Sequence, residues 1–462
     1  MNLTNIVFLG AAITWIALPM NVNHTSVMWK KPEYVMAFAM FGFSGIAMFL
    51  GITSSVGGDA LLLIRFSPLI AAGIFVTIVN LANGAIVRPP GLLLFGVFVP
   101  MGAFAIVEHS FVMPLMSLAI LGPAIVVPRL GYSTEPLYTG LRDAVRVTLI
   151  VLSLYIMILP GQVIGPCRGD KCSIWGLSIG AFGSGNAFGV YLAFVAGISI
   201  ILARNAITAA LSTIASAALV DATSGRSAMI AWAVTVLAAH TWRLTRSSKK
   251  SHAVKVTGIG AAALVTVVGT YPWRPDDFTG RANLWIVAKE QFLSSPLFGY
   301  GPSFWVRQER TSYVDSNYAT HNLLWELLIS SGFVGTALLT MSVLWLIRSS
   351  HPEVQGLTVV LTTAWLASST LEVTAAPGRL YLLPGVLLLI FVQGQSRTHK
   401  TGGSSDFHES GALISRADAE SWSMLGGWAP TRPGSGAFKG GELLTRKLGD
   451  GSRGCGVFRV FR

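Results

Sequence analysis

Long runs of apolar residues with almost no charge constrain this chain more than any other feature. The segments 34–52, 145–160, 186–203 and 379–393 each approach the ~20 residues that an α-helix needs to cross a bilayer. Charged residues make up only 12% of the chain, against about 25% in soluble globular proteins. A closed β-barrel needs alternating apolar and polar residues instead of continuous runs. The sequence therefore predicts an all-α integral membrane protein.

The apolar runs predict 12 or 13 transmembrane helices. The first run lacks a basic segment before it and a small-residue cleavage site after it, so we interpret it as a span and not as a signal peptide. The predicted spans lie near 4–20, 34–52, 62–84, 91–107, 111–127, 145–162, 186–203, 205–221, 226–240, 254–271, 321–347, 356–373 and 379–395.

Basic residues predict the orientation. The loop 241–255 has five Lys and Arg residues and no acidic residue, so it is expected on the cytoplasmic side. Alternation of the spans then places the loops 162–185 and 272–320 outside. The net charge of +12 arises from loops and tail without a recognisable nucleic-acid fold, so no nucleic acid is expected as a partner. Cys167 and Cys172 lie in an outer loop, where disulfides persist, but their spacing leaves the bond open.

Composition divides the chain into two parts. Residues 1–395 form the predicted polytopic membrane domain. Residues 396–462 are rich in glycine, and their apolar residues are scattered without a period. Such a segment buries too little apolar surface to offset its chain entropy, so a disordered cytoplasmic tail is expected there.

One outer loop, 272–320, is much longer than the other connections, and long loops in compact proteins are often functional. Within it, residues 281–293 have a helical pattern that places Leu284, Trp285, Ala288 and Phe292 on one side. This pattern predicts a helix at the membrane interface with Trp285 as its anchor.

The stretch 321–335 carries the most information. At about 100° per residue, positions 332 and 335 return to within roughly 20° and 40° of position 321. A continuous helix would therefore place His321, Gly332 and Gly335 on one face. Two glycines on that face would let a neighbouring helix approach closely and would turn the histidine toward the bundle.

These residues resemble a known family. His321-Asn322, nine residues, Gly332, two residues and Gly335 match the His-containing motif of the O-antigen ligase and polymerase family, which includes oligosaccharyltransferases that modify protein hydroxyls. Four further segments resemble family motifs, and the whole resemblance covers about residues 180–345. They are Asn186–Gly189, Ser224–Ser227 (with Gly225 inserted before Arg226), Gly280-Arg281 followed by Trp285, and the turn Pro296–Gly301, which contains Tyr300.

The resemblance implies a glycosyltransferase on the outer face of the bacterial cytoplasmic membrane. Its donor would be a glycan linked to a polyprenyl diphosphate of the undecaprenyl type. Its acceptor would be a hydroxyl group of a glycan, a lipid core or a protein, and membrane lipids would surround it. Neither a metal ion nor another cofactor is implied. The sequence does not distinguish ligase, polymerase and protein glycosylation.

The chemistry of this transfer suggests roles for individual residues. Histidine can accept a proton at neutral pH, so His321 is the candidate general base, or at least the residue that positions the acceptor. Arginine binds phosphate oxygens through two donors and stays charged, so Arg281 and Arg226 are the candidates that hold the diphosphate. The resemblance suggests Asn322, Asn186 and Tyr300 as substrate contacts.

Two acidic residues leave alternatives open. Glu326 lies within a predicted span, where an ionisable group is a functional candidate, and we consider it for substrate binding beside a purely structural pairing. Glu372 either forms a simple ion pair with Arg379 or flanks the acceptor path.

A different class of function also fits about a dozen spans. A polytopic transporter or a flippase for lipid-linked glycans would place its essential residues near the middle of the membrane and would show related halves. The candidate residues here lie at outer helix ends and the two halves are not evidently similar, which favours the enzyme.

Overall fold

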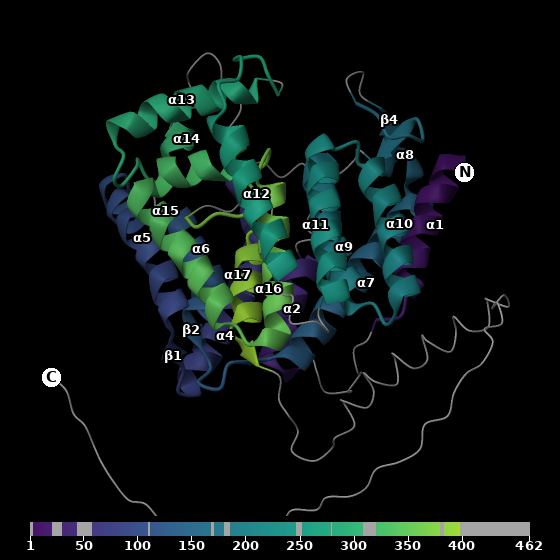
Figure 1. Ribbon diagram of the computed structural model, residues 1–462, viewed down its shortest axis with the longest axis horizontal. Coiled ribbons are helices and arrows are strands. Elements are labelled where there is room, and N and C mark those ends of the chain that lie inside the picture. The colour runs from purple at the N-terminus through teal and green to yellow at the C-terminus, as the bar shows by residue number, and fades with distance from the viewer. Residues whose placement is uncertain are drawn as a thin grey trace, which may run out of the picture. The chain divides into compact units, whose positions relative to one another are not determined.

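The computed structural model describes residues 3–20, 30–43, 58–109, 111–167, 171–179, 185–245, 252–278, 280–307, 320–378 and 383–397. These residues belong to one compact unit, Met1–His399, which is built mainly of helices (Figure 1). Residues 398–462, which form most of the predicted tail, lie outside the described residues, and so does Arg379.

The helices follow one another along the chain. They are α1 (Leu3–Ala17), α2 (Pro32–Phe38), the π-helix η2 (Ala39–Phe43), α4 (Gly58–Ala82), α5 (Pro89–Val107), α6 (Val112–Ile125), α7 (Thr134–Ile158), α8 (Pro160–Val163), α9 (Gly185–Leu202), α10 (Ala206–Ala222), α11 (Arg226–Thr245), α12 (His252–Thr270), α13 (Arg281–Ser294), α14 (Phe304–Arg307), α15 (Leu323–Ser349), α16 (Pro352–Ser368) and α17 (Gly385–Gly394).

The described residues also form three short strand pairs. β1 (Ile86–Val87) pairs antiparallel with β2 (Val126–Val127), and β3 (Tyr132–Ser133) pairs parallel with β6 (Ser396–Arg397). β4 (Ile164–Pro166) and β5 (Leu177–Ile179) form an antiparallel hairpin. Cys167 and Cys172 within this hairpin are joined by a disulfide, which answers the question that their spacing left open.

Three helices, α5, α9 and α15, are long and apolar enough to cross a membrane by length and composition. Seven further helices of the described residues are apolar but shorter. The prediction of a helical membrane protein is therefore confirmed in its coarse form. The number of spans and the side of each loop stay predictions.

Helix boundaries depart from the predictions at several places, of which α7 and α16 are two. α7 begins at Thr134, well before the predicted start at 145, because its first half is amphipathic and packs against α2. Its buried Arg142 pairs with Asp143 at 2.8 Å, which hydropathy alone does not anticipate. α16 ends at Ser368 and not at 373, and an irregular segment follows it.

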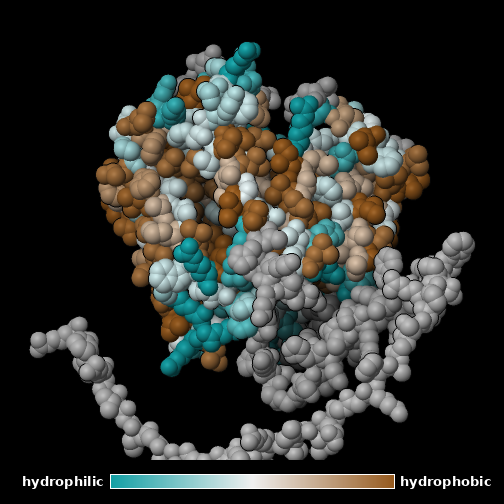
Figure 2. Space-filling model, in the orientation of Figure 1, coloured by the Kyte–Doolittle hydropathy of each residue, from teal (hydrophilic) through white to brown (hydrophobic). Residues whose placement is uncertain are grey.

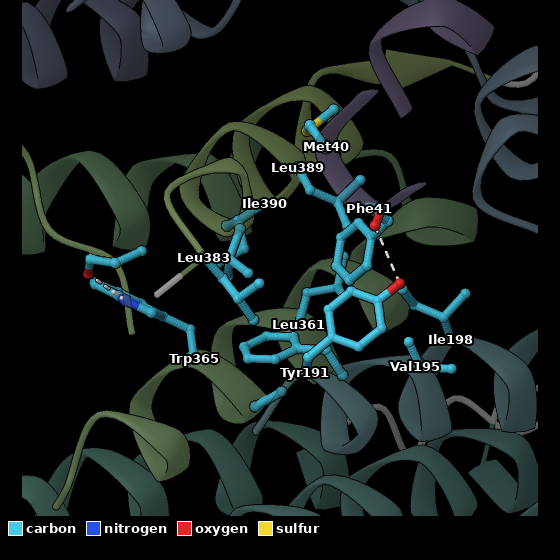
Figure 3. Packing of buried hydrophobic residues seen from close by; sticks show 14 of the residues in the cluster. Met40, Phe41, Tyr191, Val195, Ile198, Leu361, Trp365, Leu383, Leu389 and Ile390 are labelled. Carbon is cyan, nitrogen blue, oxygen red and sulfur yellow. Dashed lines mark hydrogen bonds between the residues drawn. The ribbon is translucent and has the colours of Figure 1, made fainter. Parts of the chain in front are cut away.

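Helix α9 forms the centre of the core. It is buried along nearly its whole length between α7, α10, α11 and α16, as expected for a helix that is apolar on every side. Its Tyr191 hydroxyl donates to the carbonyl of Phe41 at 3.0 Å (Figure 3) and lies 2.8 Å from the Thr148 hydroxyl. Phe41 lies in the π-helix, and the hydrogen bond from Tyr191 satisfies its carbonyl inside the apolar core.

Large apolar side chains also cover the flanks of the unit. Figure 2 shows many of them between two ends that carry more hydrophilic residues. Ile78, Leu92, Val99, Ile214 and Ile259 are each more than half exposed. Exposed apolar surface of this extent is characteristic of helices that face lipid.

Helix α15 is broken at Gly332, where φ is 64° and ψ is −167°. The turn 296–301 fills the break. A Cβ atom at Gly332 would lie 2.2 Å from the carbonyl oxygen of Leu297. Three backbone hydrogen bonds connect the turn to the helix: Tyr300 N to Ile329 O at 2.7 Å, Phe333 N to Pro296 O at 2.8 Å, and Val334 N to Leu297 O at 3.1 Å.

The prediction that His321, Gly332 and Gly335 share one face of a continuous helix is therefore wrong. His321 precedes the helix and has a left-handed backbone, with φ of 54°. Because the helix is broken at Gly332, the rotation of 100° per residue does not continue across this position. The glycine is needed because the carbonyl of Leu297 occupies the space of a side chain, and not because a second helix approaches.

We expect Gly332→Ala to lower the free energy of unfolding by at least about 2 kcal/mol, since it adds a clash to an unfavourable backbone conformation. Gly260→Ala is the matched control, because it lies on an exposed helical face with nothing within 4 Å of its Cβ position. Thermal unfolding of the purified protein in detergent measures both. Equal melting temperatures for the two variants would contradict the assigned role of Gly332.

Candidate functional site

His321 is held by its neighbour Asn322, the N-cap of α15. The Asn322 side-chain oxygen accepts hydrogen bonds from Leu324 N at 3.1 Å and Trp325 N at 3.4 Å. Its amide nitrogen donates to the carbonyls of Val265 in α12 and Thr370 after α16, both at 3.1 Å. Asn322 is fully buried, so this geometry favours a positioning role for it over the predicted contact with substrate.

Helix α13 fixes the residue on the other side of His321. The indole nitrogen of Trp285 donates to the carbonyl of Thr320 at 2.7 Å. The predicted helix is present at Arg281–Ser294, and Leu284, Trp285 and Ala288 are buried on one face. Trp285 is only 3% exposed and packs against Phe278, so it anchors α13 to the protein and not to the membrane interface.

Glu372 joins three of the predicted site residues. Its carboxylate lies 2.7 Å from His321 Nδ1 and accepts a hydrogen bond from Asn186 Nδ2 at 2.9 Å. It also forms an ion pair with the Arg281 guanidinium, which donates in addition to the Leu371 carbonyl at 2.7 Å. One carboxylate therefore connects the start of α9, the start of α13, the entrance to α15 and the segment after α16.

The electrostatics favour an ionised Glu372. Burial raises the pKa of its carboxyl, but the hydrogen bond and charge of His321, the charge of Arg281 and the bond from Asn186 together outweigh burial. The net result is a pKa below the ordinary value. The side chains of His321 and Arg281 are 16% and 22% exposed, against 9% for Glu372. The carboxylate thus lies beneath two partly accessible basic groups.

Comparison with known proteins defines the surrounding region. Residues 210–340 match the family model of O-antigen ligase. We call this matched segment the O-antigen ligase domain. No curated protein is significantly similar to the chain. The match confirms the resemblance to the O-antigen ligase and polymerase family.

The O-antigen ligase match includes His321 and Arg281 but ends before Glu372 and begins after Asn186. The cluster of His321, Arg281, Glu372 and Asn186 therefore includes two residues, Glu372 and Asn186, from outside the matched range. Glu372 was not identified as its centre from the sequence, because the only signal there was an acidic residue near a span. Arg379, the partner in one of the two alternatives for Glu372, lies outside the described residues.

Arg226 is the first residue of α11 and lies within the O-antigen ligase domain. It is exposed, and its neighbour Gly225 packs against Asn186, since a Cβ at Gly225 would lie 3.0 Å from the Asn186 side-chain oxygen. Ser224 has a left-handed backbone, with φ of 52°, which turns the chain between α10 and α11. The inserted glycine thus permits the contact between this turn and Asn186.

Tyr300 and Glu326 both make contacts with the chain near the start of α15. The backbone of Tyr300 bonds to the broken helix α15, and its ring packs against Phe304 at a centroid distance of 5.1 Å. Glu326 is buried and accepts a hydrogen bond from the Thr320 hydroxyl at 3.3 Å. Both positions favour structural roles. Substrate binding by these residues stays a prediction.

We expect Glu372→Gln to destabilise the protein at neutral pH by about 3 kcal/mol, the usual cost of removing one partner from a buried ionic cluster. Because the pKa of Glu372 is lowered by folding, its stabilising effect is fully present above the ordinary value of 4.5 and is lost as the pH falls through the folded-state pKa. The difference in melting temperature between the two proteins should therefore shrink on acidification below about 4.5.

Glu290→Gln, on the exposed face of α13, is the control for this experiment, and its small effect should not follow the same course. A difference between wild type and Glu372→Gln that stayed constant or grew on acidification would contradict the ionised cluster.

Proposed function

We propose that this protein transfers a glycan from a polyprenyl-diphosphate-linked donor to a hydroxyl acceptor at the outer face of the bacterial cytoplasmic membrane. The O-antigen ligase domain indicates glycosyl transfer of the ligase and polymerase type, with a lipid-linked donor and an acceptor in the membrane. The observation that carries the proposal is the carboxylate of Glu372, which holds the candidate base and a candidate phosphate-binding group side by side.

His321 acts as the general base in this proposal. When its Nδ1–H donates to Glu372, Nε2 is the nitrogen that takes the proton from the attacking hydroxyl. The carboxylate sets the orientation of the ring and compensates the positive charge that the ring acquires. Glu372 is therefore a positioning residue, which acts on the acceptor through His321.

Arg281 binds the diphosphate of the donor. The leaving diphosphate gains negative charge as the glycosidic bond breaks, and a guanidinium group compensates this charge through two donors. Glu372 and the carbonyl of Leu371 hold the Arg281 side chain in place before substrate arrives. Arg226, next to the glycine that packs against Asn186, supplies a second positive charge.

Two features support an outward-facing site. The hairpin with the Cys167–Cys172 disulfide lies at the same end of the unit as α13 and α14 (Figure 1), and its Ile174 N–H donates to Asp221 at 3.0 Å, close to Arg226 in sequence. Disulfides persist in oxidising compartments. At the opposite end of α11, Arg243 caps the carbonyls of Ile200 and Ala203, as expected for the cytoplasmic side.

The test is transfer by the purified protein in nanodiscs, with a polyprenyl-diphosphate-linked glycan and a panel of glycan, lipid and protein acceptors. We expect His321→Ala to lower the rate by about 10²-fold to 10⁴-fold, the usual contribution of a general base, while the protein stays folded. The acceptor that works distinguishes ligase, polymerase and protein glycosylation.

Glu372→Asp keeps the charge and should retain more activity than Glu372→Gln, and Glu290→Gln should behave as wild type. Transfer by His321→Ala at nearly the wild-type rate would refute the assigned base. A folded wild-type protein that transfers to none of these acceptors would refute the enzymatic proposal.

A further inference from the structure

A row of aromatic rings leads from the surface of the protein to α13. Its members lie on the segment between α12 and α13 and on α13 itself. The ring of Trp273 lies between those of Tyr271, at a centroid distance of 4.4 Å, and Phe278, at 4.9 Å. Phe278 in turn lies 5.4 Å from Trp285. Tyr271 is 56% exposed and Trp285 only 3%, so the aromatic row begins at the surface and ends inside the protein.

The buried end of the aromatic row adjoins the candidate site. The indole N–H of Trp285 donates to the carbonyl of Thr320, the residue before His321. At Phe278, the backbone carbonyl accepts a hydrogen bond from the N–H of Arg281 at 3.5 Å. The aromatic row thus connects exposed surface to the chain beside both the candidate base and the candidate phosphate-binding group.

The rings are held in fixed orientations. The indole N–H of Trp273 donates to the carbonyl of Val268 in α12 at 2.8 Å. Phe278 has a left-handed backbone, with φ of 54°, which is unfavourable for a bulky residue. In this conformation its ring fills the space between Trp273 and Trp285. A surface fixed in this way loses little conformational entropy when a ligand binds to it.

Hydrogen-bonding groups accompany the exposed end of the aromatic row. Arg274 and Asp276 are exposed, and neither side chain forms an ion pair within the described part of the chain. A carboxylate oxygen of Asp277 accepts from the Arg274 N–H at 2.8 Å and closes a tight turn that holds these residues close together. The Tyr271 hydroxyl likewise has no hydrogen-bond partner among the described residues. An exposed ring and polar groups with unused hydrogen-bonding capacity therefore lie on one short segment.

We infer that the exposed end of the aromatic row binds a pyranose ring, either of the donor glycan or of a glycan acceptor. The inference rests on the proposed function, which brings glycans to this end of the protein. One face of a pyranose presents C–H groups, whose partial positive charge favours contact with the negative face of an aromatic ring such as Tyr271. The hydroxyls at its rim need hydrogen-bond partners, which Arg274 and Asp276 can supply.

The alternative is a membrane anchor, because Tyr and Trp are enriched at the headgroup level of membrane helices. Two observations favour the glycan. The polar atom of Trp273 is bonded inside the protein and is not directed to headgroups. The aromatic row also continues inward to Trp285 and the chain beside His321, which an anchor does not require.

The first experiment measures glycan binding without transfer. The full-length protein in nanodiscs is applied to an array of immobilised pyranose oligosaccharides. Tyr271→Leu keeps an apolar side chain but removes the ring, so it should weaken binding about twofold to tenfold, the usual value of one aromatic contact. Tyr271→Phe keeps the ring and should weaken binding less than Tyr271→Leu does.

Trp175→Leu is the matched control. Trp175 is an aromatic residue of the β4–β5 hairpin, is 40% exposed and contacts no aromatic ring among the described residues. Its replacement should leave glycan binding unchanged. Equal losses for Trp175→Leu and Tyr271→Leu would indicate a general membrane anchor and would overturn the inference. A wild-type protein that binds no oligosaccharide of the array, or a Tyr271→Leu protein that binds as wild type does, would also overturn it.

Transfer assays then identify the source of the sugar. If the donor glycan stacks on Tyr271, Tyr271→Leu should raise KM for the lipid-linked donor by the same twofold to tenfold and leave kcat unchanged. If a glycan acceptor stacks there, KM for that acceptor should rise instead. Unchanged KM values for both substrates would overturn the inference.

The array also separates this inference from the proposed function. His321→Ala should bind the oligosaccharides as wild type does, because binding requires no proton transfer. Tyr271-dependent binding by a wild-type protein that transfers to no acceptor would refute the enzymatic proposal alone. Transfer that depends on His321 but is insensitive to Tyr271→Leu would refute the aromatic row alone.

Discussion

A buried carboxylate requires compensation, and Glu372 obtains it from residues that are far apart in the sequence. An ionised group that is 9% exposed would be strongly unfavourable without partners. Here His321, Arg281 and Asn186 provide them, and each partner comes from a different segment. The arrangement forces the start of α9, the start of α13 and the entrance to α15 to meet at the segment that follows α16. The candidate site lies where these four segments meet.

The same demand for satisfied polar groups explains why the helices break where they do. Backbone that leaves helical geometry at membrane depth must find partners within the protein. The turn 296–301 supplies them at Gly332, and Asn322 and Trp285 supply them on either side of His321. These breaks place non-helical segments at one end of an otherwise regular helical bundle. Side chains in such segments are not restricted to the directions that a helix imposes. A candidate active site built this way is rigid because every break is bonded to a neighbour.

The proposed roles divide the site between positioning and chemistry. Buried residues such as Asn322 and Glu372 are bonded on several sides and orient others, whereas His321 and Arg281 keep part of their surface accessible.

The sequence by itself determined the membrane class, the approximate positions of the helices and three members of the cluster. Apolar runs report directly on burial in lipid, and the spaced motifs around His321, Arg281 and Asn186 carry a family signal that the match at 210–340 confirms for the ligase domain. Hydropathy missed the first half of α7, because its Arg142 is buried by packing and by its pairing with Asp143 instead of by lipid. Only the tertiary structure decided that Glu372 joins the cluster, that Trp285 faces inward and that Gly332 breaks α15. Each of these depends on which distant segment fills the adjacent space, and a local pattern of residues contains no information about that segment.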